Sequence, residues 1–280
     1  MLEFSLHLLS LQTVIYMMRN FIYILLLSVT FSACSKYQQV LKSPDLEHKF
    51  KMAKQYYEEE QYFKALPIFD ELNTLYRGTA KAEEVYYYLA YTHYGLSEHL
   101  IAAYHFRTFS LTFPSSKHRE EMAYMNAYCY YLESPTHSLD ASNTYRAIEE
   151  LQLFVDVFPE SDRVEKCNRL IDNLRAKLET KSFEIAKLYF DTGNYKAAIT
   201  ALNNVTLDYP DTDYSEEIHF LILDANHLLA SNSVSSKQKE RWSNTVSAYH
   251  QFVDKFESSK KLKDAESIYN KAIKQLEKLN

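Results

Sequence analysis

The stretch that decides the fold is residues 186–210, which read AKLYFDTGNYKAAITALNNVTLDYP. Its landmark residues fall at the spacing of two helices joined by a tight turn: Ala186, Tyr189, Gly193, Asn194, Tyr195, Ala198, Leu202 and Pro210. Proline lacks a backbone N–H donor and is disfavoured in a helix interior, so Pro210 predicts where the second helix stops. The stretch therefore predicts one helical hairpin.

The end of this hairpin recurs along the chain. A helical stretch ends on an aromatic residue at five places, Tyr76, Phe113, Phe158, Tyr209 and Phe256, and three of these residues are followed by proline. The intervals are 37, 45, 51 and 47 residues, close to the roughly 34-residue period of tetratricopeptide repeats with room for insertions. This repetition predicts an α-solenoid of about five tetratricopeptide-like helix pairs.

The first four units also share small residues where paired helices approach each other closely. Aligned on their aromatic endings, these are Ala53, Ala65, Ala90, Ala102, Ala127, Ala147, Ala186 and Ala198. Large apolar residues follow at Phe69, Phe106, Leu151 and Leu202, whereas the fifth unit has Thr245 where alanine is expected. Composition agrees with an all-α fold, because 3 glycines in 280 residues is far below the roughly 7% average usage.

The boundaries of the helix pairs follow from these landmarks. The expected pairs are 45–60 with 62–77, 80–96 with 98–113, 117–132 with 141–158, 180–192 with 194–209, and 214–230 with 238–256. Two insertions, 133–140 and 231–236, have the composition of turns. Residues 162–178 predict a connecting helix that continues into the fourth unit. Residues 260–279 predict a C-terminal capping helix over the last repeat.

The beginning of the chain has a different character. Met18-Arg19-Asn20 precedes the apolar run 21–31, which is too short to span a bilayer comfortably and is typical of a secretion signal. Ser32-Ala33-Cys34-Ser35 then resembles the bacterial lipobox, with Phe31 where leucine is usual. The resemblance implies that Cys34 is lipidated and becomes the mature N-terminus. An ordinary cleaved signal and an uncleaved anchor helix are the alternatives.

This signal sets the expected domain organisation and location. Residues 1–33 are an upstream extension with a lipoprotein signal peptide that is removed, and 34–44 form a lipidated tether. Repeats one to three occupy 45–161, and 162–280 hold the connecting helix, repeats four and five and the cap. More than one acyl chain makes anchoring stable, and Ser35 stands where an aspartate would resemble an inner-membrane retention signal. We expect the bacterial outer membrane, facing the periplasm.

Motifs for catalysis, metal binding and nucleic-acid binding are not found in the sequence. It has no Gly-rich phosphate loop, nucleophile elbow or His-Glu-x-x-His motif, and His93, His99 and His105 are spaced by six residues rather than along one helix face. We therefore expect no enzyme activity, no metal and no cofactor besides the covalent lipid. The net charge of −6 argues against nucleic acid. Cys129 and Cys167 are expected as buried thiols, with a disulfide as the alternative.

Tyrosine is the residue in excess, with 24 copies. Runs such as residues 86–91 and 128–131 lie on the first helices of their units and cover every face of a helix. Some of these rings must pack between helices, while others point into the concave groove of the repeats. There an amphipathic ring offers contact area and a hydroxyl group at low entropic cost.

Two stretches carry a resemblance to a known family. Residues 143–154, followed by Phe158-Pro159-Glu160-Ser161, are similar to the third repeat of the BamD family, lipoproteins of the outer-membrane β-barrel assembly machinery. Residues 193–212 resemble the fourth repeat of that family. With the lipobox and the number of repeats, the resemblance extends over nearly all of residues 34–280.

The resemblance implies a non-enzymatic adaptor. Its C-terminal repeats would dock on the periplasmic domains of BamA, alongside other subunits of the complex, and its N-terminal repeats would receive unfolded outer-membrane β-barrel proteins. By this analogy the substrate groove of the first two units contains Tyr57, Tyr62, Tyr87, Tyr91 and Tyr94. Units four and five would face BamA, with Asn194, Asp211 and Lys255 as candidate contacts.

Two other classes of protein compete with this interpretation. Another periplasmic tetratricopeptide scaffold lipoprotein of the cell envelope would share the anchor and the repeats but would not bind BamA. An α-superhelical peptidoglycan-cleaving enzyme would need a separate catalytic domain, and the repeats and the cap leave no room for one.

Overall fold

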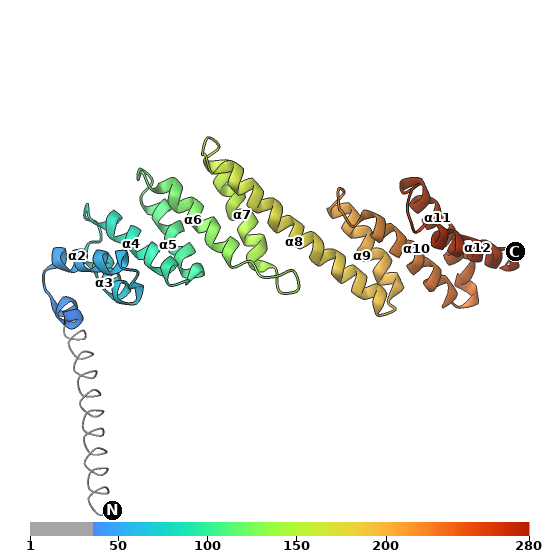
Figure 1. Cartoon of the computed structure of the whole chain (residues 1–280), viewed down its shortest axis with the longest axis horizontal. Helices are drawn as coiled ribbons and strands as arrows, with labels where there is room; N and C mark the ends of the chain where they lie inside the picture. Colours follow the sequence, from blue (N-terminus) through green and yellow to red (C-terminus); the bar gives the residue numbers. More distant parts are fainter. Residues whose placement is uncertain (1–35, 280) are drawn as a thin grey trace, which may run out of the picture. The chain divides into compact units, whose positions relative to one another are not determined.

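The computed structural model describes residues 36–279, and an all-α fold is confirmed for them (Figure 1). Residues 36–42 are helical, and no strand occurs between residues 36 and 279. The helices that follow are α2 (Leu46–Glu58), α3 (Tyr62–Leu75), α4 (Ala82–Gly95), α5 (His99–Thr112), α6 (Arg119–Leu132), α7 (Ser142–Val157), α8 (Val164–Asp191), α9 (Tyr195–Asp208), α10 (Ser215–Ser231), α11 (Ser235–Lys255) and α12 (Leu262–Leu279).

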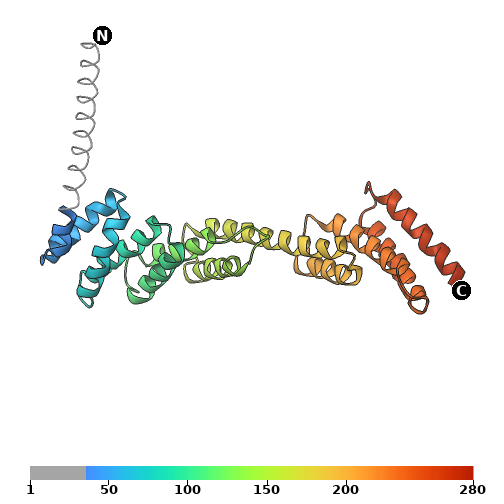
Figure 2. The same ribbon diagram turned by 90° about the horizontal axis from the view of Figure 1, so that it is seen from below.

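The chain forms two compact units, Met1–Leu132 and Glu133–Asn280. The described part of the first unit holds α2 to α6, and that of the second holds α7 to α12. Within each unit every helix packs against the next one in the sequence, as expected of stacked helix pairs (Figure 2). The functional division at residues 161 and 162 stays a prediction.

Each of the five aromatic landmarks ends a helix, as the sequence predicts. Each is the C-cap residue of its helix: Tyr76 of α3, Phe113 of α5, Phe158 of α7, Tyr209 of α9 and Phe256 of α11. In each case its backbone N–H donates to the carbonyl four residues earlier at 2.8–2.9 Å. The landmark is thus the last residue held by the helical hydrogen-bond ladder.

A second repeated feature follows each landmark. Three residues later stands a serine or threonine: Thr79, Ser116, Ser161, Thr212 and Ser259. Its backbone N–H donates to the landmark carbonyl, and its side-chain oxygen accepts from the N–H two residues further on, both at 3.0–3.2 Å. This turn, which short hydroxyl side chains favour, leads the chain into the next pair.

Two long helices differ from the regular pair. The predicted connecting helix does continue into the fourth unit, since α8 runs unbroken over 28 residues. The predicted turn at 231–236 was too long, because α11 begins at Ser235. Val234 has an extended backbone with ψ 149°, and its carbonyl accepts from the N–H of Lys237 at 2.9 Å, so the first helical turn already includes the serines.

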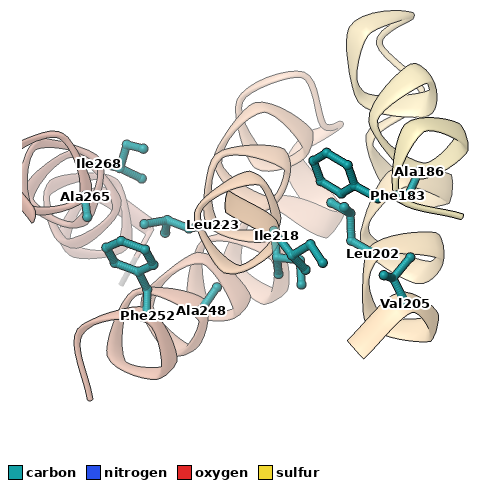
Figure 3. Close-up of a cluster of buried hydrophobic side chains, with 11 residues drawn as sticks. Phe183, Ala186, Leu202, Val205, Ile218, Leu223, Ala248, Phe252, Ala265 and Ile268 are labelled. Carbon is teal, nitrogen blue, oxygen red and sulfur yellow. The ribbon is translucent and has the colours of Figure 1, made fainter. Parts of the chain in front are cut away.

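The core confirms the alignment of the repeats. All eight alanines and all four large apolar residues that the alignment singled out are 0% exposed. In the second unit, Phe183, Leu202, Leu223 and Phe252 belong to one buried cluster that extends to α12 (Figure 3). The exceptional Thr245 is also 0% exposed, and its hydroxyl donates to the carbonyl of Arg241 at 3.1 Å. Its polar group is therefore satisfied within its own helix.

Candidate functional sites

The lipid-attachment residue, Cys34, lies outside the described residues. None of the described helices combines the length and the apolar character that crossing a membrane requires. Cys129 and Cys167 are both buried thiols, as predicted. Burial raises the pKa of the Cys167 thiol to about 11, so this side chain stays protonated at neutral pH.

The five tyrosines predicted to line a substrate groove are brought together in the first unit, and all five are half-buried. Their rings form a continuous chain, with centroid distances of 5.6 Å for Tyr62–Tyr57, 4.8 Å for Tyr87–Tyr91 and 6.4 Å for Tyr91–Tyr94. Tyr88 closes the gap, at 5.2 Å from Tyr57 and 5.4 Å from Tyr87. The sequence run contains Tyr88, but its role as the link depends on the packing of α2 against α4.

A carboxylate from α6 holds the centre of this tyrosine chain. The hydroxyl of Tyr91 donates to Oε1 of Glu121, and that of Tyr87 lies 3.4 Å from the same oxygen. The other carboxylate oxygen lies 3.2 Å from Nδ1 of His118, whose ring centroid is 4.7 Å from that of Tyr87. Glu121 was not among the site residues predicted from the sequence, so its contact with α4 was missed.

Burial keeps the central tyrosines neutral. It raises the pKa of Tyr57 and Tyr91 above the ordinary value of 10.0, and the hydrogen bond to Glu121 raises that of Tyr91 further. Burial, and secondly the negative charge of Glu121, raise the pKa of Tyr87. These hydroxyls therefore act as hydrogen-bond donors at any physiological pH.

A hollow of about 450 Å³ lies beside the tyrosine chain. It is lined by Ala80, Glu83, Glu84, Tyr87, Tyr88, Lys117 and His118. Two carboxylates and a lysine face it together with two aromatic rings. Such a surface suits an extended peptide, because it offers apolar contact, hydrogen-bond partners and charges of both signs. Lys117 and the two glutamates were not among the predicted groove residues.

The three candidate docking residues do not share one site. Asn194 is exposed in the turn between α8 and α9 and lines a mostly apolar hollow of about 710 Å³ with Tyr189, Tyr195 and Leu229. Asp211 lies in the turn between α9 and α10, and Lys255 ends α11 beside a hollow of about 390 Å³. Because successive helices are antiparallel, the last two residues lie at the opposite end of the pairs from Asn194. Their role in docking stays a prediction.

Two of the three histidines that the sequence left apart meet across a hairpin. The rings of His93 on α4 and His105 on α5 stack at 4.8 Å with an angle of 9°. Nδ1 of His93 lies 2.7 Å from Glu98, and Nδ1 of His105 lies 3.1 Å from the hydroxyl of Tyr86. Within residues 36–279, no group of three or more His, Cys, Asp or Glu side chains is placed to hold a metal ion.

Comparison with known proteins identifies the family. Residues 44–242 match the model of the YfiO family, described as outer membrane lipoprotein. A search of curated proteins finds no match.

Solved structures of tetratricopeptide-repeat proteins show limited likeness. One is the TPR domain of P58(IPK), with a TM-score of 0.40, 13% identity and coverage of 85% of this chain and 68% of that one. Another is a putative kinesin light chain of Podospora anserina with nearly identical TPR-like repeats, with a TM-score of 0.32, 15% identity and coverage of 74% and 95%. The match to the family model spans well over half of the chain, and the protein therefore belongs to the YfiO family of outer membrane lipoproteins, the BamD family.

Proposed function

We propose that this protein is a non-enzymatic adaptor of the outer-membrane β-barrel assembly machinery. The observation that carries the proposal is the family match over residues 44–242. The paired helices of the two units agree with it, since stacked repeats present extended surfaces to peptides and folded partners. Lipid attached to Cys34 would hold the chain at the outer membrane, facing the periplasm.

We infer that the tyrosine chain of the first unit receives the substrate. A C-terminal segment of an unfolded barrel protein, ending in an aromatic residue, would place its ring against Tyr87 and Tyr88. Lys117 and His118 line the same hollow and would face a terminal carboxylate. The tyrosines are already packed against one another, so binding would order few additional side chains.

The second unit would dock on the periplasmic domains of BamA, with other subunits of the complex nearby. Asn194, Asp211 and Lys255 stay the first positions to change. The alternative is another periplasmic scaffold lipoprotein of the cell envelope, which would share the fold and the anchor. Partner identity separates the two functions.

The groove is tested by peptide binding. We would measure by fluorescence anisotropy the affinity of the purified chain for a labelled C-terminal decapeptide of a barrel protein. Tyr87→Ala with Tyr88→Ala is expected to weaken binding at least tenfold, because both rings line the hollow. Tyr249→Ala with Tyr269→Ala removes a ring pair stacked at 4.4 Å in the second unit and serves as the control. Equal affinities of the two variants for the peptide would refute the assignment of substrate binding to the tyrosine chain.

A further inference from the structure

Helix α12 has two sides of opposite character. Its apolar side packs on α10 and α11. Ala265 and Ile268 join the large cluster of the second unit (Figure 3). Ala272 packs with Trp242 and Ala230 in a smaller cluster. These three α12 residues are at most 7% exposed. The other side of the helix must therefore face away from the repeats.

That other side is a stripe of lysines, which we call the α12 lysine stripe: Lys263, Lys271 and Lys274. With Glu266, Ser267 and Asn270 they line a shallow hollow of about 430 Å³ on the helix surface, and all six side chains are exposed. Residues three, four and seven apart lie on one side of a helix, so the stripe runs along most of the length of α12.

The charges of the stripe are not neutralised within the described part of the chain. Elsewhere Lys81 and Lys237 each pair with a glutamate three residues further on, at 2.7 Å and 3.1 Å. The exposed Lys51 and Lys239 resemble the stripe instead, because no ion pair within the described residues includes them. No ion pair within residues 36–279 includes Lys263, Lys271 or Lys274. The stripe therefore keeps its positive charge in a chain whose net charge is −6.

The arrangement also works against the stability of the helix. Lys271 and Lys274 are three residues apart, which brings two like charges together on the helix surface. Lys263 lies in the first turn, where the helix dipole disfavours a positive charge. An acidic partner would offset both of these unfavourable terms.

The composition of the stripe indicates what kind of partner fits. An interfacial helix inserts large apolar side chains into a lipid surface, and no large apolar residue of α12 is exposed within the described residues. Glu266 lies among the lysines and would repel a uniform polyanion. Ser267 and Asn270 add directional hydrogen bonds, which suit a folded protein surface with acidic and neutral groups in fixed positions.

We propose that the α12 lysine stripe docks an acidic surface of a partner protein. The inference rests on the proposed adaptor function and assigns the docking face of the second unit to a helix that lies beyond residues 44–242, the part matched by the family. It also differs from the three docking residues named from the sequence, none of which lies on α12.

The test is the binding of the full chain to the purified periplasmic domains of BamA, measured by surface plasmon resonance between 50 and 300 mM salt. Lys271→Glu with Lys274→Glu is expected to weaken binding at least tenfold and to flatten its salt dependence. Lys51→Glu with Lys239→Glu makes the same change in net charge at exposed residues of α2 and α11 and is expected to stay within twofold of the unchanged protein.

Each other outcome overturns a distinct claim. If the α12 variant binds with unchanged affinity, or if both variants lose affinity equally, the α12 lysine stripe is not the docking surface. Either result would leave the adaptor function in place. A chain without substitutions that does not bind BamA would overturn the adaptor function and the stripe with it. Vesicles of phosphatidylglycerol serve as a second probe, because lysine-dependent binding to them alone would overturn the choice of a protein partner. Thermal unfolding monitored by circular dichroism verifies that both variants are folded.

Discussion

The ring of Tyr62 lies directly over the backbone of Gly95. A methyl group added at Gly95 would be 2.5 Å from Cζ, 2.6 Å from Cε2 and 2.7 Å from Cε1 of that ring. These distances are too short for non-bonded carbon atoms, so glycine in the last turn of α4 is what allows Tyr62 to pack there. One end of the tyrosine chain thus depends on the absence of a side chain on the neighbouring helix.

Gly95→Ala should therefore displace Tyr62 and lower the free energy of unfolding by about 1–2 kcal/mol, because overpacking exceeds the gain from a better helix former. The measurement is urea unfolding in a double-mutant cycle. In a Tyr62→Ala background the clash is gone, and Gly95→Ala should then stabilise the protein by up to about 1 kcal/mol. Destabilisation of the same size in both backgrounds would show that the ring does not cause it.

The turns between the two helices of a pair give a second prediction. Gly193 has φ +78°, and the equivalent Glu60 and Ser97 have φ +57° and +59°, a conformation that favours glycine. Gly193→Ala should cost about 1 kcal/mol, although its added methyl group would meet no atom closer than 4.0 Å. Glu60→Gly should instead stabilise the protein by up to about 1 kcal/mol. Glu59→Gly, at φ −84°, is the control and should destabilise it.

A buried ion pair in the first unit gives a third prediction. Lys49 is 3% exposed, and its Nζ lies 2.7 Å from both carboxylate oxygens of Glu71. Glu71→Gln leaves a buried ammonium without its counter-charge and should cost about 1–3 kcal/mol, a value reduced because the carboxylate is partly exposed. The double variant Glu71→Gln with Lys49→Met should recover most of the lost stability, because it no longer contains a buried ammonium group. Glu58→Gln, from the exposed pair with Lys54 at 4.0 Å, should change stability by less than about 0.5 kcal/mol.

The stacked histidines are expected to make the stability of the folded protein depend on pH. Burial, and secondly the charge of His93, lower the pKa of His105 from 6.5 to about 4. The unfolded chain then binds a proton that the folded chain does not, so stability is complete above pH 6.5 and is lost as pH falls toward 4. The loss should be about 1–3 kcal/mol, because His105 is only partly buried.

His105→Gln should remove this loss of stability at low pH. The free energy of unfolding, measured with urea at intervals between pH 7 and 4, gives its slope against pH for both proteins. Asp70 from α3 acts in the opposite direction, since burial raises its pKa and its protonation favours the folded chain. Both proteins contain Asp70, so the difference between them isolates His105. Identical slopes for the two proteins would contradict the assignment.

The sequence predicted the fold well because its signals are local. An aromatic residue followed by proline, and alanine at matching places in each unit, report directly where helices end and where they touch. The repeated serine or threonine three residues after each landmark was equally visible in the sequence and would have fixed the turns. The early start of α11 was missed because serine suits both a turn and the first turn of a helix.

The candidate sites were less predictable, because their contacts join helices that are distant in the sequence. The five tyrosines predicted for a substrate groove lie in one chain of rings, but Tyr88 links them only once α2 lies beside α4. Their role in substrate binding stays a prediction. Glu121 is 30 residues from Tyr91, and no spacing rule connects the two. The contact between His93 and His105 likewise arises when a hairpin folds back on itself, which a search along one helix face does not detect.

The function we propose is that of a lipid-anchored adaptor that binds BamA. Affinity purification of the membrane-extracted protein through a C-terminal tag, with mass spectrometry of the partners and of the N-terminal peptide, tests it most directly. We expect BamA to copurify and the N-terminal peptide to begin at an acylated Cys34. An acylated Cys34 without BamA would contradict the adaptor function, and an N-terminus without lipid would contradict the anchor.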